Sequence, residues 1–287
     1  MDVALHTMRW GVVLKGKSME LKGRNAVVTG AAGGIGAAIA AALHERGARV
    51  LLADLAEEVA DTAAALGQPH WTGDVSSAEG VTGLFAAAER ELGQVDLYFA
   101  NAGITGATGL GGEDDWDRVI DVNLRAHIRA AERLVPEWTA RGEGYFVATA
   151  SAAGLLTQIG QAGYSVTKHA ALAFAEWLSV TYGDDGLRVS VLAPMGVNTK
   201  ILWGEDLKSI TGDALTGQRA VAEAGNVLEP ADVAITVMAA IEAETFLILP
   251  HPEVLDMYRM KGSDYDRWLR GMRRYQTKLQ GTSAAER

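Results

Sequence analysis

Short apolar segments alternate with alanine-rich stretches along most of this chain. From residue 25 onward, seven runs rich in branched and aromatic residues have the length and character of strands. These runs span 25–29, 49–54, 70–74, 95–100, 144–150, 188–193 and 246–250. Most are continuous apolar runs, which is typical of parallel strands that are covered on both faces. The repeated order predicts an α/β fold, a doubly wound parallel seven-stranded sheet with helices on both faces.

The stretches between the predicted strands have helical character. They span 35–46, 55–66, 78–92, 114–142, 164–182 and 230–243. A chain of 287 residues can form one large α/β domain or two small ones. No linker divides this chain, so we predict a single domain over 19–253. The segment 1–18 precedes it, and we expect that extension to be poorly ordered.

The composition argues against several classes of function. A formal net charge of −10 disfavours nucleic acid as the main partner, because phosphate binding needs a basic face. The absence of cysteine excludes disulfides, thiolate metal sites and a cysteine nucleophile, and the scattered histidines predict no metal site. No apolar run reaches the ~18 residues that a membrane-spanning helix needs. We expect a soluble, cytoplasmic protein without a metal, a nucleic-acid partner or a membrane.

A glycine-rich turn, Thr29-Gly30-Ala31-Ala32-Gly33-Gly34-Ile35-Gly36, joins the first strand to the first helix. Glycines permit a tight turn and close approach of a pyrophosphate, and the helix N-terminus offers unpaired N–H groups to that anion. A glycine cluster alone can be a flexible turn, but its place between strand and helix favours a dinucleotide site. The predicted contacts in this turn are Gly30, Gly33, Gly34, Ile35 and Gly36.

Two aspartates end the second and third strands. Asp54 follows Gly36 by eighteen residues, where a carboxylate can accept hydrogen bonds from the adenosine ribose. Its charge would repel a 2′-phosphate, and no Arg or Lys nearby offsets it, so NAD is favoured over NADP. Asp54 can also cap the following helix, which is compatible with this role. Asp74, with Val75 beside it, can contact the adenine or cap the helix at 78–92.

Tyr164 and Lys168 are four residues apart on a predicted helix, so their side chains share one face. An ammonium beside a phenol favours the phenolate, which lowers the tyrosine pKa from its ordinary value of ~10. A phenol tuned in this way can take or return the proton of an alcohol. The same spacing also occurs on solvated helix faces, so its weight depends on the other motifs.

Taken together, these motifs resemble the short-chain dehydrogenase/reductase family, whose domain is a Rossmann fold. The resemblance covers residues 19–250 and rests on the glycine turn, the Tyr164/Lys168 pair and four further segments. These segments are Asn101-Ala102-Gly103, Val122-Asn123-Leu124, Ser151-Ala152-Ala153-Gly154 and the run from Pro194 to Thr199. Ser151 lies thirteen residues before Tyr164, as the family pattern requires.

The resemblance implies four catalytic residues. Ser151 would orient the substrate oxygen, Tyr164 would move the hydroxyl proton, and Lys168 would lower the tyrosine pKa and bind the nicotinamide ribose. Asn123 would hold a water that relays protons to Lys168. By residue type alone, Ser151 is a turn serine and Asn123 an exposed polar residue of a helix. The implied cofactor contacts are Asn101, Ala102, Gly103, Tyr164, Lys168, Pro194, Val197 and Thr199.

One segment departs from the family pattern, which usually has Pro-Gly after the sixth strand. Here Met195 follows Pro194, and its adaptable apolar side chain favours a hydrophobic substrate. The segment 200–227 is expected to form a lid over the substrate, as in the family. The predicted pocket residues are Leu155, Thr157, Met195 and Trp203. Apolar residues of this region can equally serve to pack the lid on the body.

The expected activity is NAD-dependent hydride transfer between the nicotinamide and a small-molecule secondary alcohol or ketone, apolar or aromatic. One alternative is an NADPH-dependent carbonyl reductase. Another, from a different class, is a non-catalytic dinucleotide-sensing protein. The intact set of catalytic residues speaks against the sensor.

The tail 254–287 extends past the family core, and its 255–280 segment predicts one amphipathic helix. Aromatic and apolar residues recur at helical spacing, with arginines between them. Such a helix can bind a membrane surface or a partner groove. We favour packing on a neighbouring subunit, because family members are commonly homodimers or homotetramers.

Overall fold

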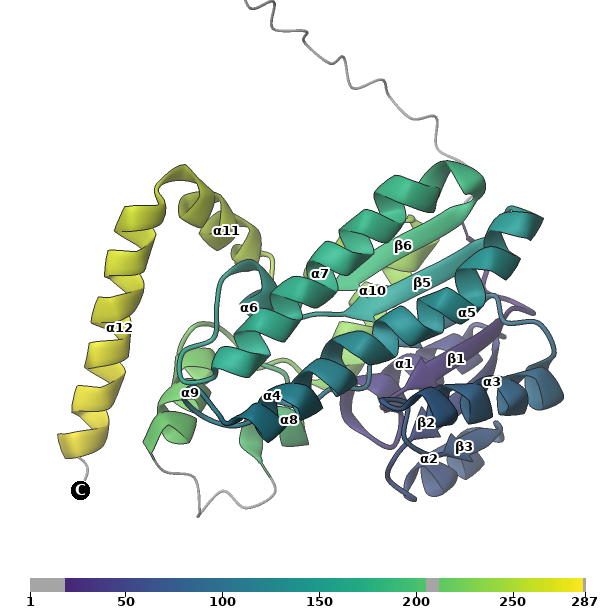
Figure 1. Ribbon diagram of the computed structural model, residues 1–287, viewed down its shortest axis with the longest axis horizontal. Helices are drawn as coiled ribbons and strands as arrows, with labels where there is room; N and C mark the ends of the chain where they lie inside the picture. Colours follow the sequence, from purple (N-terminus) through teal and green to yellow (C-terminus); the bar gives the residue numbers. More distant parts are fainter. Residues whose placement is uncertain (1–18, 205–211, 286–287) are drawn as a thin grey trace, which may run out of the picture.

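Seven parallel strands form the central sheet, in the order β3-β2-β1-β4-β5-β6-β7 (Figure 1). The computed structural model describes residues 19–204 and 212–285. The strands are β1 Asn25–Thr29, β2 Arg49–Asp54, β3 His70–Thr72, β4 Leu97–Ala100, β5 Gly144–Thr149, β6 Leu187–Leu192 and β7 Leu247–Ile248. The predicted fold is therefore confirmed. The predicted extension 1–18 and residues 205–211 of the expected lid lie outside the described residues.

Helices cover both faces of the sheet. One face carries α1 Gly34–Glu45, α2 Val59–Leu66 and α10 Pro230–Glu242, and the other carries α3 Ala78–Leu92, α5 Ala126–Arg141 and α7 Ala162–Tyr182. The two faces bury separate apolar clusters because neighbouring strand residues point to opposite sides. In β4, Tyr98 joins the cluster under α5 and α7, whereas Phe99 joins the cluster under α1 and α10.

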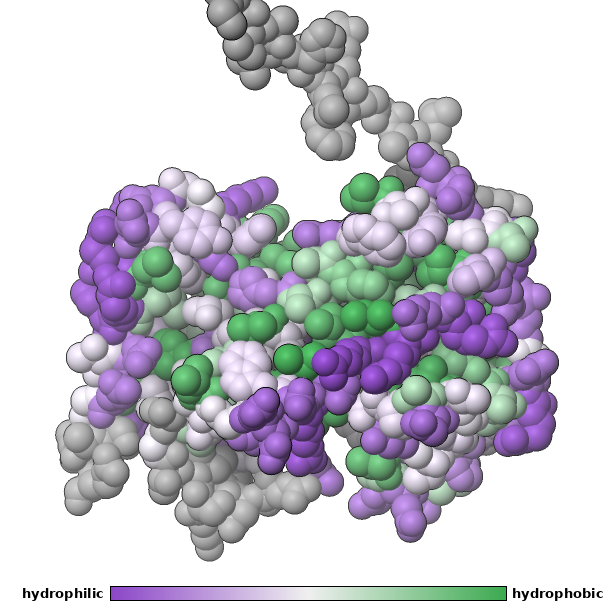
Figure 2. Space-filling view, in the orientation of Figure 1, coloured by the Kyte–Doolittle hydropathy of each residue, from purple (hydrophilic) through white to green (hydrophobic). Residues whose placement is uncertain are grey.

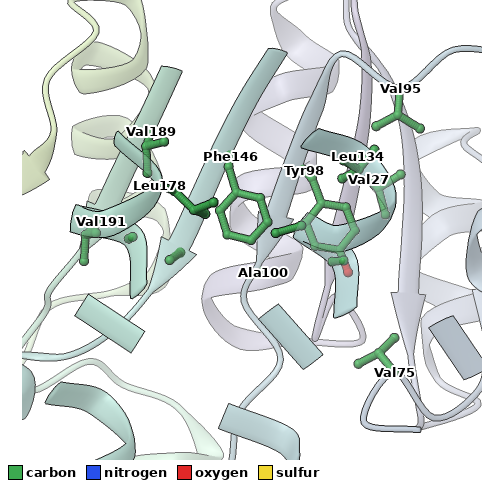
Figure 3. Packing of buried hydrophobic residues seen from close by; sticks show 14 of the residues in the cluster. Val27, Val75, Val95, Tyr98, Ala100, Leu134, Phe146, Leu178, Val189 and Val191 are labelled. Carbon is green, nitrogen blue, oxygen red and sulfur yellow. The ribbon is translucent and has the colours of Figure 1, made fainter. Parts of the chain in front are cut away.

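Aromatic stacking ties the middle strands together. The rings of Tyr98 on β4 and Phe146 on β5 stack with centroids 5.7 Å apart, and Leu178 of α7 lies close to Phe146 (Figure 3). Both aromatic side chains are almost fully buried. Burying such side chains contributes about 1.5–3 kcal/mol each, so this stack fixes the sheet that carries the site.

The helix predicted over 114–142 is interrupted. It consists of α4 Glu113–Ile120, a π-helical turn Asp121–Arg125, and α5. A π turn inserts an extra residue into the helical ladder and often occurs at functional sites. Periodicity could not reveal it, because one extra residue barely shifts the apolar pattern. Short elements absent from the prediction are α6 Ala152–Leu155, the 3₁₀ turn Gly183–Asp185, α8 Lys200–Trp203 and α9 Gly212–Ala222.

The C-terminal tail forms two helices, α11 Glu253–Ser263 and α12 Tyr265–Ala285, rather than the one predicted. The chain bends at Asp264, and α12 runs beside α9 (Figure 1). The Tyr275 hydroxyl donates to the Ala220 carbonyl at 3.2 Å, and Leu279 is 1% exposed. The part of the apolar face around Tyr275 and Leu279 therefore packs on this chain's own α9, whereas Tyr258 and Tyr265 are exposed. The expected contact with a neighbouring subunit stays a prediction.

Candidate active site

A large cavity opens at the carboxyl ends of the strands, with a volume of about 1510 Å³. Residues directly after β1, β2, β4, β5 and β6 line it, which is the position where doubly wound sheets bind ligands. Typical small-molecule sites have volumes of about 300–1,000 Å³, so this cavity has room for two ligands. Its far end is closed by α9, α11 and α12, which lie beyond that end of the sheet (Figure 1).

The glycine turn forms the first wall of the cavity. A Cβ on Gly36 would lie 2.1 Å from the Gly30 carbonyl oxygen, so only glycine lets helix and turn pack this closely. A Cβ on Gly33 would meet nothing within 4 Å, and Gly33 faces the cavity in extended backbone. The first N–H groups of α1 have no side-chain cap. This open cradle has the shape and the free N–H groups that a pyrophosphate needs.

Asp54 ties β2 to the glycine turn and lies in the cavity wall. Its Oδ2 accepts from the Ala32 N–H at 2.9 Å, and its Oδ1 accepts from the Ala56 N–H at 3.0 Å. The N-cap of α2 is Glu58, so the alternative role of Asp54 as a helix cap is wrong. The carboxylate is held in place beside the glycine turn, and its contact with a nucleotide ribose stays a prediction.

Asp74 and Val75 also line the cavity. The Asp74 Oδ1 accepts from the Ser76 N–H at 2.8 Å and from the Ser76 hydroxyl at 2.6 Å. Helix α3 is capped instead by Ser77, whose Oγ accepts from the Gly80 N–H at 2.9 Å. The cap role suggested for Asp74 is therefore wrong, and its contact with the adenine stays a prediction.

Asn101 braces three strands at the floor of the site. Its Nδ2 donates to the Thr29 carbonyl at 3.0 Å, and its Oδ1 accepts from the Thr149 hydroxyl at 3.0 Å. Asn101, Ala102 and Gly103 all line the cavity. A Cβ on Gly103 would lie 3.2 Å from Asn123 Oδ1 and 3.3 Å from Lys168 Nζ, so glycine leaves these groups their space.

Ser151, Tyr164 and Lys168 meet in the cavity wall, as predicted. Ser151 is the N-cap of α6, and its hydroxyl is hydrogen-bonded to the Tyr164 phenol. The Lys168 ammonium is 3% exposed, donates to the Thr149 carbonyl at 2.9 Å, and lies 5.6 Å from the Tyr164 ring centroid. A hydroxyl, a phenol and a cation thus converge where a substrate oxygen could bind.

The predicted lowering of the Tyr164 pKa is wrong in this arrangement. Burial of the half-buried phenol raises the pKa of Tyr164, and the hydrogen bond with Ser151 offsets part of this rise. Burial also lowers the pKa of Lys168 to about 8. Because the ammonium is directed at the Thr149 carbonyl rather than at the phenol oxygen, the lysine does little to stabilise a phenolate here.

Asn123 lies in the π turn and is fully buried, so its interpretation as an exposed residue is wrong. Its Oδ1 accepts from the Ile104 N–H at 2.9 Å, and its Nδ2 donates to the Ile104 carbonyl at 2.8 Å and the Thr167 hydroxyl at 3.1 Å. These bonds hold the segment after β4 against α7. The side chain positions the site, and the water-holding role stays a prediction.

The segment after β6 crosses the cavity toward the glycine turn. Pro194, Met195, Val197 and Thr199 all line it. The Pro194 carbonyl accepts from the Ala152 N–H at 2.8 Å, which joins this segment to the one that follows Ser151. The Thr199 methyl group would lie 3.1 Å from a Cβ on Gly34. The substitution of Met195 for the usual glycine leaves the segment in its expected place.

The predicted substrate residues divide into two groups. Thr157 and Met195 line the cavity, whereas Leu155 is 3% exposed in the core and the Trp203 indole donates to Asn198 at 2.8 Å. Neither Leu155 nor Trp203 is among the described lining residues. The prediction missed lining residues on α4, in the loop after α6 and on the tail helices. These include Arg118, Gln158, Met257, Met260, Trp268, Met272 and Tyr275.

The described residues lack two further features. No group of three or more His, Asp or Glu side chains is arranged to hold a metal ion there. Among the same residues, no helix combines the length and apolarity that crossing a bilayer requires.

Comparisons with known proteins agree with this geometry. Residues 24–208 match the family described as short chain dehydrogenase. The chain is 33% identical over 234 residues to cis-4-hydroxycyclohexanecarboxylate dehydrogenase from Sinomonas cyclohexanicum, covering 78% of this chain and 92% of that protein. It is 35% identical over 230 residues to glycine betaine reductase ATRR from Emericella nidulans, covering 77% of this chain but only 18% of that protein.

Solved structures show the same likeness. A short-chain dehydrogenase/reductase from Burkholderia phymatum, in complex with NAD, superposes with a TM-score of 0.78 at 30% sequence identity. The match covers 86% of this chain and 96% of that one.

Proposed function

Because the chain belongs to the short-chain dehydrogenase/reductase family, we propose that it transfers hydride between NAD and a secondary alcohol or ketone with an apolar or aromatic body. The observation that carries the proposal is the meeting of Ser151, Tyr164 and Lys168 in one cavity with the glycine turn. The similar protein from Sinomonas cyclohexanicum is a dehydrogenase of cis-4-hydroxycyclohexanecarboxylate, which agrees with the reaction class.

Three side chains of the site have separate roles in the proton transfer. Ser151 donates a hydrogen bond that positions the substrate oxygen, and Tyr164 takes the hydroxyl proton in oxidation or returns it in reduction. Lys168 places a positive charge behind the phenol and can contact a bound ribose. When bound, the nicotinamide would accept or supply the hydride at the same carbon.

The raised pKa of Tyr164 has a direct consequence for pH dependence. The phenol holds its proton at neutral pH, which suits donation to a ketone oxygen. Alcohol oxidation needs the phenolate, so its rate should rise with pH, and ketone reduction should fall at alkaline pH. Profiles of kcat in both directions measure this, and an oxidation rate that falls above pH 7 would contradict it.

The test of the catalytic role is Tyr164→Phe, assayed against a panel of secondary alcohols with NAD. We expect turnover to fall at least about 1,000-fold, because general acid/base catalysis typically contributes about 100- to 10,000-fold and the hydroxyl also orients the substrate. The dissociation constant of NAD, measured by calorimetry, should stay within about threefold. Retained turnover would refute the role of Tyr164. NAD binding without turnover in the wild type would instead favour the sensor.

The preference for NAD rests on Asp54, whose carboxylate is fixed beside the glycine turn. A 2′-phosphate placed there would meet this negative charge, and the alternative, NADPH-dependent reductase needs a cation in its place. The ratio of kcat/KM for NAD over NADP measures the preference. A wild-type ratio below one would make the NADPH reductase the better description.

We also propose that the protein acts as a homodimer or homotetramer. Three large apolar side chains of α7 are more than half exposed: Val166, Trp177 and Val180. Hydrophobic residues gather along this helix on the face that Figure 2 shows. A second copy that covers α7 would bury them. Light scattering should give a mass above 30.4 kDa, and Trp177→Glu should shift it toward the monomer.

A further inference from the structure

We infer that the tail helices α11 and α12 build a second subsite, which binds the bulky, uncharged, apolar body of the substrate. This inference rests on the proposed function, because the subsite adjoins the Ser151/Tyr164 centre in one cavity. The residues of the subsite on the tail are Met257, Met260, Trp268, Met272 and Tyr275.

The tail is fixed to the catalytic core by a buried lysine. Lys261 of α11 is 7% exposed, and its ammonium donates to the Leu155 carbonyl at 2.7 Å and the Leu156 carbonyl at 2.9 Å. The same ammonium lies 3.3 Å from His169 Nε2 and 5.6 Å from the Tyr265 ring centroid. A buried cation is stable only with such partners, so α11 has a defined position on the core.

His169 completes this attachment. Its Nδ1 lies 2.8 Å from the Ser165 carbonyl, which can only accept, so Nδ1 carries the proton and Nε2 accepts from Lys261. His169 follows Lys168 directly on α7. The tail is therefore joined to the helix that carries the catalytic pair, and to the segment that leads from Ser151 to the cavity wall.

Helix α12 closes the outer side of the subsite. Leu279 packs with Ile159 and Ala220 in a small apolar cluster, against which Met272 and Tyr275 also pack. This cluster joins α12 to α9 and to the loop after α6. The subsite is consequently bounded on both sides by this chain's own elements.

The side chains left for a ligand are apolar and adaptable. Met257, Met260 and Trp268 line the cavity but pack into none of the three hydrophobic clusters of the described chain. Methionine adapts its shape to irregular apolar ligands, and tryptophan offers a large flat face. These three side chains are therefore available to contact a hydrocarbon body.

The charges at this end disfavour an anionic ligand group. Burial raises the pKa of the Tyr275 phenol, and the negative charge of Glu223, which also lines the cavity, adds to this rise. The described basic lining residues are Arg118, Lys168 and Lys200, which come from α4, α7 and α8. Arg270, Arg273 and Arg274 of α12 line a separate surface hollow. The subsite thus suits an uncharged group.

The experiment is a series of 4-substituted cyclohexanols carrying hydrogen, methyl, tert-butyl or cyclohexyl, assayed with NAD. In the wild type, kcat/KM should rise at least 20-fold from the smallest to the largest alcohol. Trp268→Ala should abolish most of this rise and change cyclohexanol itself by less than threefold. The control is Leu269→Ala, because Leu269 is the next residue on α12, is 46% exposed and does not line the cavity.

A second variant and a binding measurement provide two further tests of the subsite. Met257→Trp fills the subsite from α11, so it should lower kcat/KM for the cyclohexyl alcohol at least tenfold and spare cyclohexanol. An equal loss for all alcohols, or an equal effect of Leu269→Ala, would overturn the inference. If no alcohol is oxidised, the proposed function fails. Calorimetry of 4-cyclohexylcyclohexanol with the protein and NADH then tests whether the subsite binds an apolar body. Weaker binding to Trp268→Ala supports it, and identical or absent binding overturns it.

Discussion

At the scale of single residues, burial holds a lysine of the site and a histidine near it away from their ordinary pKa values. Lys168 is nearly inaccessible with one carbonyl partner, and His127 is 1% exposed behind it on α5. Burial lowers the pKa of Lys168 to about 8, and burial together with the Lys168 charge lowers the pKa of His127 to about 3. Both groups therefore couple the stability of the fold to pH.

The first prediction concerns Lys168→Met, which removes a buried cation while keeping much of its volume. The folded pKa is about 8 against 10.5 when unfolded, so burial of the charge costs stability in full below pH 8. The variant should gain up to about 3 kcal/mol in free energy of unfolding at pH 7 while losing turnover.

Denaturant melts at several pH values measure this difference. Between pH 8 and pH 10.5 the unfolded wild-type chain binds more protons than the folded one, so its stability rises with pH. The advantage of Lys168→Met should accordingly shrink over that window. An advantage that is the same at pH 7 and pH 10 would show that packing, and not charge, is responsible.

The second prediction concerns His127→Leu. His127 stays neutral in the fold, but its unfolded pKa is 6.5, so wild-type stability is lost as pH falls from 6.5 toward 3. Between pH 7 and pH 5 the wild type should lose about 2 kcal/mol more than the variant. Urea melts at both pH values check this, with His44→Leu, an exposed histidine on α1, as the control. Parallel pH dependence of wild type and variant would refute it.

At the scale of elements, local features were predictable from sequence and non-local ones were not. The residues of the glycine turn are contiguous, and Tyr164 and Lys168 are one helical turn apart. The local sequence alone therefore defines both features. The direction of the Lys168 ammonium depends on the Thr149 carbonyl of another strand. The burial of Asn123 depends on Ile104 and Thr167, and no local pattern reports such partners.

The third prediction separates two glycines of the same turn. Gly36→Ala would force a methyl group to 2.1 Å from a backbone carbonyl, so it should destabilise the fold by about 1–3 kcal/mol. Gly33→Ala meets no protein atom and has extended backbone, so the unfolding temperature without cofactor should be unchanged. Its methyl group enters the cavity, so the NAD dissociation constant should rise at least about tenfold, because a pyrophosphate needs close backbone approach.

Thermal denaturation without NAD and calorimetry with NAD distinguish these outcomes. If Gly33→Ala lost stability without cofactor, the open space beside it would be wrongly assigned. If it bound NAD like the wild type, the pyrophosphate would lie elsewhere.

At the scale of the whole molecule, the cofactor and substrate ends belong to one cavity that most elements help to build. The cofactor end follows from the order of the strands, which brings the glycine turn of β1 beside the end of β4. The far end depends on Lys261, whose partners lie 92 to 106 residues earlier in the chain. The sequence predicted an amphipathic tail. Nothing in the sequence of its apolar face shows whether that face packs on this chain's own α9 or on a neighbouring subunit.

The last prediction uses this shared cavity to test cofactor preference through global stability. A ligand that binds only the folded state at about 100 times its dissociation constant stabilises it by about 2.7 kcal/mol. For a chain of this size that corresponds to a rise in unfolding temperature of about 5–10 °C. NAD should produce this shift in the wild type, and NADP at the same concentration should produce less than about 2 °C, because Asp54 repels the 2′-phosphate.

Asp54→Asn is the informative variant, because it removes the charge while its amide oxygen can still accept from the Ala32 N–H. The NADP shift should rise toward the NAD shift in this variant, and the exposed neighbour Glu57→Ala should leave both unchanged. Equal shifts for NAD and NADP in the wild type would remove the argument from Asp54. A shift for neither would place the failure in dinucleotide binding itself, since the measurement needs no substrate.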